Sequence, residues 1–190
     1  MSKNMKIVLG VAGIIVVIAL TLVSMYNGLV RGNESVTTAW AQVETQYQRR
    51  FDLIPNLVES VKSVLKQEQT VFGDLAEART KYAGAVSPEA KVAAANGVES
   101  VLSRLLVIME NYPQLKSNET VQTLMAQLEG AENRISVERG RYNESVKVFN
   151  IKVKTFPTNM IAGWFGFSPR TMFEAVKGAE TAPKVDLKLE

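Results

Sequence analysis

Carboxylates are the main side chains with catalytic potential in this chain of 190 residues, which has no histidine and no cysteine. The commonest general base, the thiolate nucleophile and the usual zinc ligands are therefore missing. The three aspartates, Asp52, Asp74 and Asp186, lie far apart in the sequence, and there is no glycine-rich phosphate-binding motif. A glycosidase-type carboxylate pair would have to assemble from separate helices, and nothing indicates one. We expect no enzymatic activity, no metal and no cofactor.

A second set of polar residues falls on or beside apolar stripes of helical spacing. Because a buried charge must be paired and hydrogen-bonded, we predict that these residues pair between helices and fix the helix register. The alternative is a polar groove that grips a peptide or a partner helix. The residues are Arg50, Glu68, Arg79, Glu138, Asn143 and Asn150.

The segment IAGWFGF crowds four large apolar residues into seven positions: Ile161, Trp164, Phe165 and Phe167. One short helix cannot bury all four on one face, and clustered aromatics are typical of binding hot spots. We predict a partner-contact surface here, the alternative being a plug for the end of a bundle. In a bundle of three long helices this segment would lie at the end distal to the anchor, away from the membrane.

The element that must tether these residues is the N-terminal apolar run Ile7–Ser24, 18 residues without a charge or a proline. Its helical length of about 27 Å approaches the thickness of a bilayer core, so residues 1–26 are predicted to be a retained transmembrane anchor. A cleaved signal peptide is the alternative. Lys3 and Lys6 precede the run, which places the N-terminus in the cytoplasm and the domain outside the cell (inner) membrane, the reverse being the alternative.

Behind the anchor the apolar period is helical, which predicts an all-α domain over residues 27–175. One helix is expected over 36–82, read as kinked at Pro55, with a restart near Asp52 as the alternative. Others are expected from Pro88 to about 111, from about 118 to 156, and as a short fourth helix over 158–164. The three long helices would pack as an antiparallel up-down-up bundle. Residues 176–190 are predicted to form an extended tail.

Several segments together resemble the LemA family, in the family's order and behind a single span: YNGLVRGNESVTTAWAQVE, QRRFDLIPNLVESVK, ENYPQLKSNE, ISVERGRYNESVKVFN and FPTNMIAGWFGF. The resemblance implies a membrane-anchored helical bundle with no established enzymatic activity, and an association with membrane metalloproteases. The chain departs from the family at Gln67-Glu68, where a histidine-glutamate pair is common, which argues against a catalytic task there.

The expected function is a non-enzymatic membrane-tethered scaffold or adaptor that self-associates and positions other membrane or envelope proteins, a membrane metalloprotease among them. A peptide- or ligand-binding sensor with a groove between helices is the alternative. Only 20 basic residues face 19 acidic ones after the anchor, so a nucleic-acid partner is not expected. The long first helix would outrun its neighbours, which predicts a homo-oligomer contact through Trp40, Val43, Tyr47 and Phe51.

Overall fold

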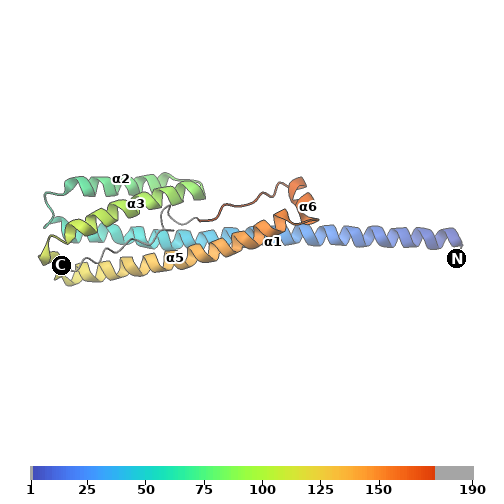
Figure 1. Cartoon of the computed structure of the whole chain (residues 1–190), viewed down its shortest axis with the longest axis horizontal. Helices are drawn as coiled ribbons and strands as arrows, with labels where there is room; N and C mark the ends of the chain where they lie inside the picture. The colour runs from blue at the N-terminus through green and yellow to red at the C-terminus, as the bar shows by residue number, and fades with distance from the viewer. Residues whose placement is uncertain (1, 174–190) are drawn as a thin grey trace, which may run out of the picture. The chain divides into compact units, whose positions relative to one another are not determined.

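The computed structural model describes residues 2–173, and the tail predicted over 176–190 lies outside them. The regular elements of residues 2–173 are all helices, with no strand among them, which confirms the predicted fold class (Figure 1). It divides into two compact units: an anchor unit of residues 2–33 and 143–173, and a bundle unit of residues 34–142. The helices are α1 (Lys3–Lys62), α2 (Gln69–Gly84), α3 (Pro88–Met109), α4 (Pro113–Lys116), α5 (Glu119–Lys154) and α6 (Thr158–Trp164).

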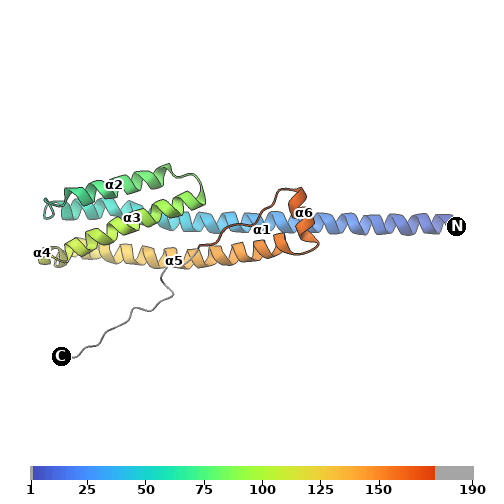
Figure 2. The same cartoon turned by 45° about the horizontal axis from the view of Figure 1, so that its top comes forward.

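The bundle unit contains one more helical pass than the sequence predicts. Its parts of α1 and α5 lie beside α2 and α3, each helix antiparallel to the next (Figures 1 and 2). The predicted single helix over 36–82 is wrong, because α1 ends at Lys62 and the chain reverses before α2. The apolar stripe changes phase at this reversal: the next buried residue after Leu65 is Val71, a step of six that no single helix face accommodates. Leu65 is itself fully buried.

The other helix boundaries follow from local signals in the sequence. The Ser87 hydroxyl caps α3 by accepting a hydrogen bond from the Ala90 amide at 3.1 Å, with Pro88 in the first turn. The Asn118 side chain caps α5 in the same way, through the Val121 amide at 3.1 Å. Helix α1 continues through Pro55 without a break, as predicted. The short fourth helix predicted over 158–164 is α6.

In the anchor unit, the N-terminal part of α1 packs against no other helix of that unit. The 18-residue window that makes α1 a candidate membrane span has none of its residues buried. Helix α3 is also long and apolar enough to span a membrane, but it supplies Val98, Leu102 and Leu105 to the core of the bundle unit. Packing in the anchor unit tightens at Gly32, where an added Cβ would lie 3.0 Å from a ring carbon of Phe149 on α5.

Candidate functional site

Arg50 of α1 is the one charged side chain among the described residues that is buried, being 6% exposed. Its Nη1 donates to Oε2 of Glu99 on α3 at 3.0 Å and to Oε2 of Glu132 on α5 at 2.5 Å. The predicted pairing between helices is therefore confirmed for Arg50, which ties three helices together. Arg50 Nε is buried and has no hydrogen-bond partner among the described residues, so the guanidinium keeps unused donor capacity.

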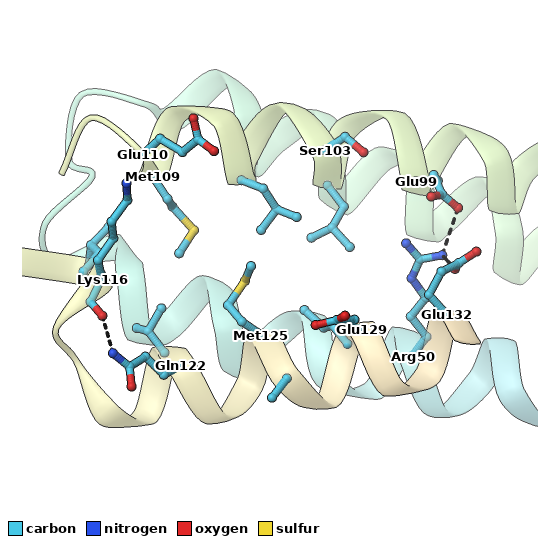
Figure 3. Close-up of a pocket in the computed structure, with 16 residues that line it drawn as sticks. Arg50, Glu99, Ser103, Met109, Glu110, Lys116, Gln122, Met125, Glu129 and Glu132 are labelled. Carbon is cyan, nitrogen blue, oxygen red and sulfur yellow. Dashed lines mark hydrogen bonds and ion pairs between the residues drawn. The ribbon is translucent and has the colours of Figure 1, made fainter. Parts of the chain in front are cut away.

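This cluster closes one end of a cavity of about 760 Å³ inside the bundle unit (Figure 3). The volume lies within the range of about 300–1,000 Å³ that is usual for ligand pockets. Met109 of α3 and Met125 of α5 point toward one another across it (Figure 3), and methionine adapts its shape to different apolar partners. The remaining apolar lining comes from Leu102, Leu106, Leu115, Val121, Ala126 and Leu128.

The charged residues around the cavity are unbalanced. Two cations, Arg50 and Lys116, face four carboxylates: Glu99, Glu110, Glu129 and Glu132. Glu99 and Glu132 share the single positive charge of Arg50, and Glu110 and Glu129 are offset only by Lys116, so each of the two groups keeps one surplus negative charge. A cavity with an apolar middle and an acidic rim favours an apolar occupant that carries basic groups.

The four residues predicted to contact a second copy of the chain instead pack within the bundle unit of their own chain. Val43, Tyr47 and Phe51 are buried, and Trp40 meets Tyr142 with ring centroids 5.7 Å apart. The premise of that prediction, an uncovered stretch of α1, is wrong, because the additional pass through α2 supplies the missing neighbour. The ring of Tyr82 on α2 packs on the rings of Phe51 and Tyr47, with centroids 4.3 and 5.9 Å apart.

The two tyrosines of this cluster differ in how their hydroxyls are satisfied. The Tyr47 hydroxyl accepts hydrogen bonds from Nε and Nη2 of Arg139, at 3.1 and 2.6 Å. Burial still raises the pKa of Tyr47, although the Arg139 hydrogen bond works in the opposite direction. The Tyr82 hydroxyl is buried and has no hydrogen-bond partner within residues 2–173. Burial raises the pKa of Tyr82 to about 12, and the charge of Glu44 adds to the effect.

The other residues of the predicted polar network do not join Arg50. Glu68 immediately precedes α2 and makes no side-chain cap, and Arg79 lies half-buried on α2. Glu138 pairs with Arg141 of its own helix at 2.7 Å. For Glu138 the prediction of pairing between helices is therefore wrong, because the helix surface offers a partner three residues away.

Asn143 and Asn150 bind an arm of the chain, residues 165–173, that follows α6 in the anchor unit. The Asn150 amide donates to the Arg170 carbonyl and accepts from the Arg170 amide, both at 2.8 Å. Asn143 does the same with Phe173, at 3.0 and 2.8 Å. Seven residues of helix advance about 10.5 Å and three residues of extended chain about 10 Å, so the two spacings match. The two asparagine side chains thus bind the backbone of the arm as the edge of a neighbouring strand would. The prediction that Asn143 and Asn150 pair between helices is wrong.

The predicted partner-contact segment lies in the anchor unit and contacts Tyr26, two residues after the end of the apolar run. The Tyr26 ring meets Phe165 at 4.7 Å and Phe167 at 6.1 Å. The expected location at the end distal to the anchor is therefore wrong, and the extra helical pass is the reason, since it reverses the direction of α5. Ile161 is buried, whereas Trp164 is 74% and Phe165 60% exposed.

Sequence reasoning missed the partners of the residues that it selected. Glu99 and Glu132 each sit next to a core residue, Val98 and Ala131, and a buried arginine requires such carboxylates. That requirement was a usable signal. Arg170, whose Nη2 donates to Asn33 Oδ1 at 2.9 Å, had no comparable signal because it lies outside any periodic segment.

A model of the LemA family matches residues 39–187 of the chain. Magnetosome protein MamQ 2 of Paramagnetospirillum magneticum is 26% identical over 200 residues, covering 92% of this chain and 73% of the relative. Magnetosome protein MamQ of Magnetospirillum gryphiswaldense is 25% identical over 187 residues, covering 85% and 69%. Protein LemA of Metamycoplasma hominis is 23% identical over 137 residues, covering 72% and 63%.

Proposed function

The chain belongs to the LemA family and is a membrane-associated helical protein, and from this premise we propose that it is a membrane-tethered adaptor without enzymatic activity. In this proposal α1 holds the protein in the membrane, and the bundle unit binds a segment of another membrane or envelope protein. The proposed orientation has the N-terminus in the cytoplasm and the bundle unit outside. A membrane metalloprotease is the partner class that the family resemblance implies.

The observation that carries this proposal is the cavity between α3 and α5. Its methionines offer an adaptable apolar floor, and Glu110 and Glu129 give it an acidic rim. The occupant with complementary chemistry is an apolar peptide segment with a lysine or arginine beside it. A backbone carbonyl of such a segment would suit the unused donors of Arg50. Helical bundles commonly bind partner segments in grooves between their helices.

A small-molecule sensor is the second candidate, because the cavity volume of about 760 Å³ also suits a small ligand. Self-association stays within the proposal as a property of the scaffold. It would use a surface other than Val43, Tyr47 and Phe51, which are buried in their own chain.

Site-specific photo-crosslinking tests the adaptor proposal in living cells. A photoreactive benzophenone side chain replaces Met125 inside the cavity, and a matched variant carries it at Val107, which lies on α3 and is 62% exposed. We expect position 125, and not position 107, to form an adduct with another protein. The adduct should map to an apolar segment with a neighbouring basic residue.

A charge-reversal pair completes this experiment. Glu129→Lys on the cavity rim should weaken the adduct, because it repels the basic residue of the partner, whereas Glu59→Lys on an exposed part of α1 should leave the adduct unchanged. An adduct between two copies of the chain would assign the cavity to self-association. Crosslinks only to small molecules would favour the sensor, and equal adducts from positions 125 and 107 would contradict both cavity proposals.

A further inference from the structure

Helix α6 and its flanks expose four large apolar side chains that we call the α6 patch: Phe156, Met160, Trp164 and Phe165, between 51% and 74% exposed. The opposite face of the same helix packs inward through Ile161 and Ala162, which are buried. The segment is therefore amphipathic, with its apolar character continued onto the exposed face. Exposed apolar clusters of this kind mark contact surfaces.

The α6 patch lies where the bare part of α1 begins. Phe165 contacts Tyr26 at 4.7 Å, and Tyr26 follows Ser24, the last residue of the apolar run. Both views show α6 beside α1, with the N-terminal part of α1 extending past it without a neighbour (Figures 1 and 2). If α1 spans the bilayer, the patch lies at the depth where hydrocarbon gives way to headgroups, the depth at which tryptophan and tyrosine are enriched.

The charged residues of the segment that carries the patch, residues 145–173, are all basic. Residues 145–173 contain Lys147, Lys152, Lys154 and Arg170 and no acidic residue. Lys152 and Lys154 form no ion pair among the described residues and stand exposed in the last turn of α5. Lysines in this position can hold anionic phosphate groups while their aliphatic stems lie against apolar surface.

We propose that the α6 patch inserts into the headgroup region of a bilayer that contains anionic phospholipids, beside the transmembrane part of α1. Phe156, Met160, Trp164 and Phe165 enter the upper acyl region, and Lys152 and Lys154 bind lipid phosphates. A helix of seven residues is too short to bind a membrane strongly by itself. Here α1 holds it at the surface, so insertion carries no separate cost of bringing it there.

The chain has two tryptophans, so single-tryptophan variants of the full-length protein test this proposal. Trp40→Phe leaves Trp164 as the reporter in vesicles of phosphatidylcholine and phosphatidylglycerol that contain no other protein. We expect Trp164 fluorescence to be quenched by lipids brominated on the upper acyl chain and protected from aqueous acrylamide. The matched variant Trp164→Phe leaves Trp40 of the bundle unit, which should not respond to brominated lipid. Circular dichroism verifies that both variants keep their helices.

The lysines give a second arm in the Trp40→Phe background. Replacing Lys152 and Lys154 with Gln should reduce the quenching of Trp164 in anionic vesicles toward its value in pure phosphatidylcholine. Unchanged quenching would overturn the role of the anionic headgroups. A Trp164 that acrylamide reaches freely and brominated lipid does not would overturn insertion and assign the patch to a protein partner. Equal quenching of Trp40 and Trp164 by lipid would overturn a contact specific to α6.

Discussion

Tyr82 buries a hydroxyl that has no hydrogen-bond partner among the described residues. Removing an unsatisfied buried polar group relieves its desolvation cost, so Tyr82→Phe should raise the free energy of unfolding by about 1 kcal/mol at neutral pH. The pKa of Tyr82 rises from 10.0 to about 12 on folding. The unfolded state therefore loses its proton first, and wild type should lose roughly 2 kcal/mol of stability as the pH rises through this interval. Urea denaturation across the pH range measures both effects.

Tyr47→Phe is the matched control, because it removes a hydroxyl that accepts two hydrogen bonds from Arg139. Hydrogen bonds to charged groups stabilise by about 1.5–3 kcal/mol, so this variant should lower the unfolding free energy at neutral pH. Tyr82→Phe should also reduce the loss of unfolding free energy at alkaline pH, because the titrating hydroxyl is gone. Two substitutions with the same effect on stability would contradict the difference in hydrogen bonding between the tyrosines.

Arg50 was identifiable from the sequence as a charge on an apolar stripe, but the two glutamates that pair with it were not. Arg50→Met should lower the unfolding free energy by about 3 kcal/mol, since Glu99 and Glu132 would face one another without the charge between them. Lys81→Met removes an exposed ion pair with Glu77 on the surface of α2 and should cost less than about 0.5 kcal/mol. Equal losses in thermal or chemical denaturation would refute a structural role specific to Arg50.

At the scale of the helices, the sequence predicted the helix boundaries that a capping residue marks. It did not predict the turn between α1 and α2, which no side chain caps. Ser87, Pro88 and Asn118 are local signals, and they predicted α3 and α5 closely. The turn between α1 and α2 has no proline, no glycine and no side-chain cap at Glu68. The turn is marked only by a change in the helical spacing of the buried residues. That change can be recognised only when Leu65 and Val71 are known to be buried.

The asparagine clamp on α5 makes a prediction at the same scale. Asn150→Ala removes both hydrogen bonds to the Arg170 backbone, so the arm should leave α5 more often and expose the bond between Arg170 and Thr171. Limited trypsin digestion of the full-length protein in detergent should then cleave after Arg170 faster than in wild type. Asn133→Ala, on an exposed face of α5, should leave the rate unchanged. Wild-type rates in both variants would show that the clamp does not hold the arm.

At the scale of the whole molecule, a single error in the count of passes misplaced two surfaces. With three long helices, the segment around Trp164 was expected far from the anchor, and α1 was expected to seek a second chain. With the reversal after Lys62, Phe165 meets Tyr26 and Val43 and Tyr47 are covered. Periodicity shows which face of each helix is buried, but the partner of that face depends on the number of passes.

The orientation of the molecule in the membrane rests on charges near the span. Lys3 and Lys6 precede the apolar run, whereas Arg31 follows it and is offset by Glu34. Lys147, Lys152 and Lys154 are too distant in the chain to direct insertion, which responds to basic residues within about 15–20 positions of a span. We therefore expect the N-terminus to stay in the cytoplasm and the bundle unit to cross the membrane.

Because the chain has no cysteine, one introduced thiol reports each side of the membrane. Ser117→Cys, exposed between α4 and α5, should react with a membrane-impermeant maleimide in cells whose outer barrier has been permeabilised. Ser2→Cys, ahead of the span, should react only after detergent dissolves the membrane, because its flank is held inside by the basic residues. The reverse pattern would place the bundle unit, and with it the cavity and its partner, in the cytoplasm. Labelling of both thiols in unbroken cells would mean that α1 does not span the membrane.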